Sequence, residues 1–198
     1  MKLLFVVPGP DAFLADAMAG LAGRGHDVTL LTAAPAWTGA AGVAVDELPV
    51  APGPWLQTGA RLHRRVSERP WAVAPHVQRE WIRHRGPRLP AAGDWLAERA
   101  AAFDLAVFAP CASSTTWAGM PLVHAPVVLH PALRDEPALH LPVVDVVLRM
   151  AHGLVFTSGE EAALAGRFVR TRPCLVVDEG SPVALDRYER FLRSRARR

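Results

Sequence analysis

Short apolar runs alternate along this chain of 198 residues with longer stretches whose apolar residues recur every three or four positions. Residues 2–7 form the first apolar run, which Pro8 and Pro10 end. Residues 11–24 follow with helical spacing, an aspartate at the start and a glycine just past the end. Residues 27–32 form the next run. This order of strand, helix and strand predicts a right-handed parallel crossover.

The alternation continues to the end of the chain. Strands are expected at residues 42–49, 104–109, 126–129, 153–156 and 174–177, and helices at residues 94–102 and 138–150, from Ser158, and from Pro182. Several strand-like runs are apolar throughout, which indicates a sheet covered on both faces. The sequence therefore predicts an α/β fold, namely a Rossmann-like, doubly wound, mainly parallel sheet with helices on both faces.

Residues 51–92 differ in kind from this alternation. Eight arginines lie between Arg61 and Arg88 and face only two glutamates. Apolar residues nevertheless fall at helical spacing, namely Trp71, Ala74, Val77, Trp81 and Ile82. We interpret this segment as a surface helical insert with one basic face, interrupted or restarted at Pro75. A merely solvated basic face is the other interpretation.

Composition narrows the class of protein. A 51% hydrophobic content gives a chain of this length enough apolar residues for the core of one domain. The cysteines at 111 and 174 adjoin apolar runs, so buried reduced thiols are expected rather than a disulfide or a metal site. The first apolar run is too short for a secretory signal, and no span of about 18 uncharged residues could cross a bilayer. A cytoplasmic protein is expected.

The sequence lacks the signature motifs of several enzyme classes. Gly9 stands alone where a dinucleotide-binding turn needs three glycines, and the flanking prolines remove backbone donors for a pyrophosphate. No acidic residue ends the second strand, and neither a Walker loop nor a Gly-x-Ser-x-Gly elbow is present. No group of His, Cys and Asp has metal-ligand spacing. These observations argue against nicotinamide, P-loop and serine hydrolase chemistry.

Polar residues follow several of the expected strands. They are Asp11 after the first strand, Ser113, Ser114, Thr115 and Thr116 after the strand at 104–109, Arg134, Asp135 and Glu136 after residues 126–129, and Thr157, Ser158, Glu160 and Glu161 after residues 153–156. Since the carboxyl ends of parallel strands share one edge of a sheet, these side chains are expected to line one cleft. Structural roles are open as well: helix capping by Asp11, Ser113 or the pair Ser158–Glu161, a helix entrance at 135–137, and a buried hydrogen bond for His130.

An ordered set of short motifs extends through the chain. It comprises residues 3–7 with Leu21-Ala22-x-x-Gly25-His26-x-Val28, Phe108-Ala109-Pro110, Gly119-Met120-Pro121-Leu122-Val123, Val128-Leu129-His130-Pro131, Asp135-Glu136-Pro137, residues 151–156, and Ser158-x-x-Glu161. In order and spacing this set resembles the N-terminal halves of family 4 glycosyltransferases of the two-domain GT-B fold. The resemblance covers Met1 to about Leu185.

The resemblance implies a hexosyltransferase-type site, with retaining transfer as the family's usual outcome. In that family the N-terminal domain contacts the acceptor and a second domain binds a nucleotide-activated sugar. Carried over, the catalytic candidates are Asp135, Glu136 and His130, and the acceptor or cleft candidates are Gly9, Asp11, Phe13, Ser113, Ser114, Thr115, Arg134, Ser158 and Glu161. Arg134 stands where related sequences often carry histidine, and an arginine stays protonated near neutral pH.

The same resemblance sets expectations for domains and partners. Residues 1–185 would form the N-terminal domain, with the insert at about 51–92, and residues 186–198 would form a basic C-terminal helix or tail. The donor-binding domain is not in the sequence, so a nucleotide sugar is implied only with a partner chain or a homodimer, as in a split or truncated enzyme. A sugar or a lipid-linked compound would be the acceptor. The alternatives are a non-catalytic scaffold, or a basic module that docks on the inner face of an anionic membrane or, less favoured, on nucleic acid.

Overall fold

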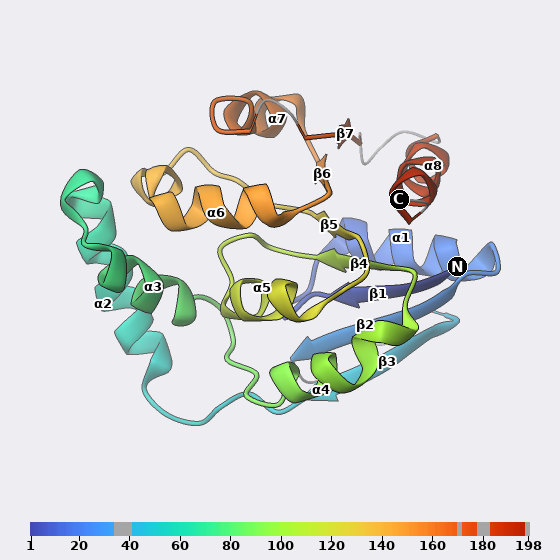
Figure 1. Ribbon diagram of the computed structural model, residues 1–198, viewed down its shortest axis with the longest axis horizontal. Coiled ribbons are helices and arrows are strands. Elements are labelled where there is room, and N and C mark those ends of the chain that lie inside the picture. The colour runs from blue at the N-terminus through green and yellow to red at the C-terminus, as the bar shows by residue number, and fades with distance from the viewer. Residues whose placement is uncertain (34–40, 170–171, 178–182, 197–198) are drawn as a thin grey trace.

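A computed structural model describes residues 1–33, 41–169, 172–177 and 183–196. Its centre is a seven-stranded sheet in the order β3-β2-β1-β4-β5-β6-β7, and every neighbouring pair is parallel (Figure 1). The strands are β1 (Lys2–Val6), β2 (Asp27–Ala33), β3 (Val43–Leu48), β4 (Leu105–Phe108), β5 (Val127–Leu129), β6 (Gly153–Phe156) and β7 (Cys174–Val176). The expected Rossmann-like, doubly wound α/β fold is confirmed.

Helices connect the strands. They are α1 (Ala12–Gly23), α2 (Trp55–Glu68), α3 (Pro75–Arg83), α4 (Ala92–Arg99), α5 (Ser114–Gly119), α6 (Pro142–Met150), α7 (Gly159–Ala165) and α8 (Ala184–Ala196), with 3-10 turns η1 (Pro70–Ala72), η2 (Ala100–Ala102), η3 (Met120–Leu122) and η4 (Pro137–His140). Among the described residues, none of these helices combines the length and the apolarity that crossing a bilayer requires.

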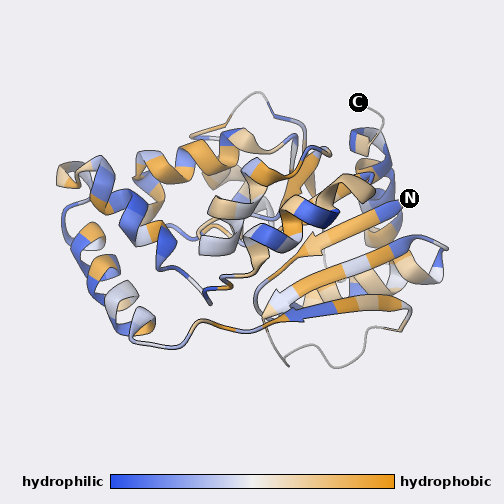
Figure 2. Cartoon of the chain, turned by 60° about the horizontal axis from the view of Figure 1, so that its bottom comes forward, coloured by the Kyte–Doolittle hydropathy of each residue, from blue (hydrophilic) through white to orange (hydrophobic). Residues whose placement is uncertain are grey.

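Each strand divides its side chains between two cores. In β1, Leu4 and Val6 enter the core that α3, α4 and α6 cover, whereas Leu3 and Phe5 enter the core that α1 and α8 cover. This period of two places apolar residues on both faces, which explains why the central strands are apolar throughout. The central strands are accordingly largely in the hydrophobic colour in Figure 2, whereas orange and blue alternate along the helices.

The expected helix at residues 138–150 is divided. The 3-10 turn η4 ends at His140, and α6 begins at Pro142, because a proline is favoured at the first helical position and biases the preceding residue toward extended backbone.

The two cysteines differ in their exposure, although both were expected to be buried. Cys111 is buried as expected, but Cys174 is exposed, since β7 is a short strand at the edge of the sheet. Both thiols are free.

The arginine-rich segment folds as α2, η1 and α3, with the expected restart at Pro75. These helices lie beyond the arrowhead of β2 in Figure 1. Val77, Trp81 and Ile82 are buried in the core, so the inner face of α3 belongs to the domain rather than to its surface. Trp71 does not share that burial, because it lies on η1 with 84% of its area exposed.

The C-terminal segment is a helix with one buried face. Ala184, Tyr188 and Leu192 recur at four-residue spacing and are buried, and Tyr188 and Leu192 pack in the core with α1 and the sheet, whereas Arg187, Arg190 and Arg193 are exposed. Pro182, the expected start of this helix, lies outside the described residues, as do residues 197 and 198. This segment is therefore basic on its exposed side, and its other side packs on α1.

A carboxylate on α8 holds this helix to the end of α1. Glu189 accepts hydrogen bonds from Arg24 at 2.8 Å and from His26 at 3.0 Å, and Arg193 lies 2.7 Å away on the same helix. Hydrogen bonds from Arg24 and then His26 lower the pKa of the Glu189 carboxyl to about 2. The interaction therefore stabilises the fold wherever this carboxylate is ionised.

We expect Glu189→Gln to lower the free energy of unfolding by about 1.5–3 kcal/mol at pH 7, because the amide is uncharged and keeps one acceptor oxygen where Arg24 and His26 donate to two. The folded-state pKa is depressed, so the contribution is present above the unfolded value near 4.5 and disappears as pH falls through about 2. Urea unfolding at pH 7 and at pH 2.5 measures it. Equal midpoints for the wild type and the variant at pH 7 would contradict this role.

Candidate functional site

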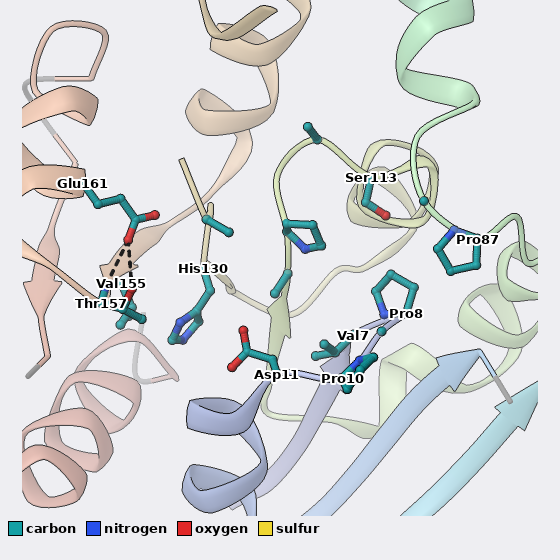
Figure 3. A pocket seen from close by; sticks show the side chains of 16 residues that line it. Val7, Pro8, Pro10, Asp11, Pro87, Ser113, His130, Val155, Thr157 and Glu161 are labelled. Atoms are coloured by element: carbon teal, nitrogen blue, oxygen red, sulfur yellow. Dashed lines mark hydrogen bonds between the residues drawn. The ribbon is translucent and has the colours of Figure 1, made fainter. Parts of the chain in front are cut away.

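A pocket of about 370 Å³ opens at the carboxyl ends of β1, β4, β5 and β6, where the strand order reverses (Figure 3). Sixteen residues line it, and the polar side chains among them are Asp11, Ser113, His130, Thr157 and Glu161. We call it the strand-end pocket. Ligands of doubly wound sheets bind at such a reversal, because the loops that follow the two central strands leave toward opposite faces.

Two helix caps supply polar groups to the pocket wall. Asp11 caps α1, and its Oδ1 accepts the Leu14 N–H at 2.9 Å. Ser113 caps α5, and its Oγ accepts the Thr115 N–H at 3.2 Å. Both capping roles were open from the sequence, and both are confirmed. Since each side chain also lines the strand-end pocket, capping fixes its position there without excluding a ligand contact.

His130 is held in an aromatic cluster at the pocket floor. Its Nε2 lies 2.8 Å from the Tyr188 hydroxyl of α8, and Phe13 packs against both rings at centroid distances of 5.7 and 5.6 Å. Burial lowers the pKa of the imidazole to about 3. The ring is therefore neutral at physiological pH and offers hydrogen bonds rather than a positive charge. So low a pKa also makes it a weak general base.

Glu161 ties together the loops that follow β5 and β6. Its Oε1 accepts the Leu133 N–H at 2.9 Å and its Oε2 accepts the Thr157 N–H at 3.0 Å, as the dashed lines to Thr157 in Figure 3 show in part. Ser158 caps α7 and accepts the Glu161 N–H at 3.1 Å. The expected capping box is thus half formed, because the carboxylate turns to Thr157 and Leu133 rather than to the Ser158 amide.

The structure brings together six of the residues that the sequence proposed for a cleft. Gly9, Asp11, Ser113, His130, Thr157 and Glu161 all line the strand-end pocket. Phe13 lies behind His130. The remaining candidates lie in neighbouring hollows, which are described next.

Arg134, Asp135 and Ser158 line an adjoining hollow of about 470 Å³ over the start of α7, which we call the intermediate hollow. Asp135 and Glu136 also line a groove of about 660 Å³ between η1 and η4, together with Trp71. We call it the Trp71 groove. The Asp135 side chain is 69% exposed, so its ion pair with Arg167 at 4.0 Å leaves it open to solvent. Neither carboxylate lines the strand-end pocket.

Ser114 and Thr115 line a separate hollow of about 450 Å³ on the outer side of α5. The Ser114 hydroxyl donates to the Pro87 carbonyl at 3.2 Å, and its N–H donates to the Arg85 carbonyl at 2.8 Å. These bonds attach the loop that follows α3 to the strand-end pocket, where Gly86 and Pro87 form part of the wall. Of the hydroxyls at 113–115, only Ser113 faces the pocket.

Sequence reasoning placed Thr157 at this edge of the sheet, as the structure does, but it missed three residues of the site. Gly86 and Pro87 come from the insert, and only the packing of α3 brings them to the pocket. Tyr188, the only tyrosine of the chain, supports His130 from α8. Its spacing from Ala184 and Leu192 marked a buried face within a segment whose arginines suggested an exposed tail.

The composition of the pocket determines what it can bind. None of the sixteen lining residues is lysine or arginine, and four are prolines, which donate no backbone N–H. A diphosphate would find no cation here. Neutral His130, the Ser113 and Thr157 hydroxyls and the Asp11 carboxylate instead suit the hydroxyl groups of a neutral polyol. Within the described part of the chain, no cluster of three His, Cys, Asp or Glu side chains could hold a metal ion.

Comparison with solved structures supports the fold. Sucrose-phosphate synthase from Thermosynechococcus elongatus superposes with a TM-score of 0.62 at 15% identity, over 98% of this chain and 98% of that chain. MurG from Acinetobacter baumannii aligns at 9% identity with a TM-score of 0.47, over 89% of this chain and 45% of that one. No family model and no curated protein matches the sequence. The likeness to the synthase is one of fold, and it is a Rossmann-like α/β glycosyltransferase fold.

We expect Glu161→Ala to lower the free energy of unfolding by about 2–4 kcal/mol, because the Leu133 and Thr157 amides lose their acceptor. Glu161→Gln retains an acceptor oxygen and should lose less. Urea denaturation gives the values, with exposed Glu160→Ala on the same helix as the matched control. A Glu161→Ala variant as stable as Glu160→Ala would show that the carboxylate does not hold these loops.

We expect the imidazole of His130 to remain neutral from pH 8 down to about pH 4, because its folded-state pKa is about 3. The unfolded chain binds this proton near pH 6.5, so the folded state loses stability as pH falls below 6.5, and the loss levels off near 3. Nuclear magnetic resonance of the ring nitrogens, assigned by comparison with His130→Gln, follows the titration. A midpoint near 6.5 would refute the burial of this ring.

Proposed function

We propose that this chain is the acceptor-side half of a sugar transferase and that the strand-end pocket receives the acceptor hydroxyl. The observation that carries the proposal is a pocket at the strand-order reversal of a glycosyltransferase-type sheet, lined by five polar side chains and by no lysine or arginine. Such a pocket suits a neutral sugar. The nucleotide sugar would then be presented by a donor-binding domain on a partner chain, which would supply the groups that bind its diphosphate.

The proposal assigns each polar side chain a role consistent with its contacts. Asp11 is anchored by its Oδ1 and accepts a hydrogen bond from the acceptor hydroxyl, while Ser113 and neutral His130 orient the sugar ring. Glu161 is engaged by two backbone amides, so it shapes the pocket and takes no part in proton transfer. Asp135 and Glu136, which line neighbouring hollows and not the pocket itself, contact the part of the acceptor that leaves the pocket.

We expect Gly9→Leu to abolish transfer while leaving the fold intact. Gly9 lines the pocket and a Cβ placed there meets no atom within 4 Å, so a leucine is accommodated but occupies space that the acceptor needs. Gly23→Leu on exposed α1 backbone is the matched control, because a Cβ there also meets no atom within 4 Å.

The measurement uses extracts of cells that lack this chain, supplied with radiolabelled UDP-glucose, UDP-N-acetylglucosamine and GDP-mannose. Adding purified wild-type chain should restore a labelled product, as should Gly23→Leu, whereas Gly9→Leu should restore less than about a tenth. Identical products with and without the chain would contradict the proposed function. Turnover of a nucleotide sugar by the purified chain alone would contradict the need for a partner.

A further inference from the structure

Trp71 is the most exposed large apolar side chain among the described residues, and it lies in a groove rather than on a convex surface. It is 84% exposed on η1, which packs against η4. The groove between these two turns also contains Asp135, Glu136 and His140. The exposed indole is therefore available to a ligand that enters the groove, and the polar side chains around it can contact the same ligand.

The walls of the Trp71 groove are fixed in place. Buried Gln78 donates from its Nε2 to the Val73 carbonyl at 2.8 Å and accepts the Val143 N–H at 3.3 Å through its Oε1. These two bonds join the loop after η1 to the first turn of α6. A preorganised wall of this kind reduces the conformational entropy that the protein loses when a ligand binds. The prolines at 70, 137 and 142 restrict the backbone further.

The groove and the strand-end pocket are neighbours, because they share lining residues with the hollow between them. Glu161 lines both the strand-end pocket and the intermediate hollow, and Asp135 lines both the intermediate hollow and the Trp71 groove. A ligand that crosses the surface over Glu161 and Asp135 would therefore join the pocket to Trp71. A single sugar in the pocket would not reach this far, whereas a chain of sugars would.

We propose that the Trp71 groove is a binding subsite for an inner sugar of a neutral oligosaccharide acceptor. The apolar C–H face of the sugar stacks on the indole, whose face carries partial negative charge, and the sugar hydroxyls donate to Asp135 and Glu136. This inference rests on the proposed function, because it names the class of acceptor for the same site.

Charge distinguishes this occupant from a lipid surface. Trp71 and the arginines of α2 and α3 together resemble an interfacial anchor, but no arginine lines the groove itself, whereas the carboxylates Asp135 and Glu136 do. Two carboxylates next to the inserting ring would repel an anionic membrane. The same two groups are hydrogen-bond acceptors for a polyol, so the local chemistry favours the saccharide.

The test uses an array of immobilised neutral monosaccharides and oligosaccharides with fluorescently labelled chain. Wild type should bind some oligosaccharides and no monosaccharide, and Trp71→Ala should weaken that binding about tenfold. Trp71→Tyr should restore most of the binding, because the ring face is retained. Leu56→Ala removes another exposed apolar side chain of the insert, at 66% exposure outside the groove, and should bind as wild type does.

Three outcomes would overturn the subsite. They are the absence of binding to any oligosaccharide, equal binding by Trp71→Ala and wild type, and loss of binding to phosphatidylglycerol vesicles in Trp71→Ala with oligosaccharide binding unchanged. The last would identify a membrane contact instead. The array needs neither a nucleotide sugar nor a partner chain. Absence of transfer together with Trp71-dependent binding would therefore refute the proposed function alone, and transfer unaffected by Trp71→Ala would refute the subsite alone.

Discussion

The reversal of strand order between β1 and β4 is the constraint on which the rest of this molecule depends. The chain passes from β1 to β2 through α1, on one face of the sheet. It passes from β4 to β5 and from β5 to β6 through α5 and α6, on the opposite face. Right-handed crossovers require these opposite faces, because the two halves of the sheet are built in opposite directions. The loops after β1 and β4 therefore separate, and a polar pocket opens in the sheet edge where the two cores meet.

Within that opening, hydrogen bonding and burial decide what each polar side chain can do. Glu161 is engaged by backbone amides from two loops, so it maintains the shape of the pocket. Burial keeps His130 neutral, with Tyr188 as its partner. Cys111 is likewise buried, which raises its pKa to about 12 and leaves it a protonated, unreactive thiol. The Asp11 carboxylate, by contrast, accepts one backbone hydrogen bond, from the Leu14 N–H, through its Oδ1.

The insert at residues 51–92 contributes residues to two of the hollows described above. Its helices α2 and α3 contribute Gly86 and Pro87 to the strand-end pocket through the loop after α3, and η1 contributes Trp71 to the groove beyond Asp135. Buried Gln78 and the packing of Trp81 join this insert to the body of the domain. A segment outside the alternation of strands and helices thereby contributes residues to both the strand-end pocket and the Trp71 groove.

Local patterns were sufficient for the elements, the parallel sheet and the caps at Asp11, Ser113 and Ser158, because side-chain period, capping chemistry and proline placement act between neighbours in sequence. They also brought Gly9, Asp11, Ser113, His130 and Glu161 to one edge. Only the tertiary structure decided that Glu161 reaches Leu133, that Tyr188 supports His130, and that Asp135 and Glu136 lie with Trp71 outside the pocket. Those contacts join residues 28 to about 65 positions apart, and loop geometry and helix packing, which no local pattern encodes, set their distances.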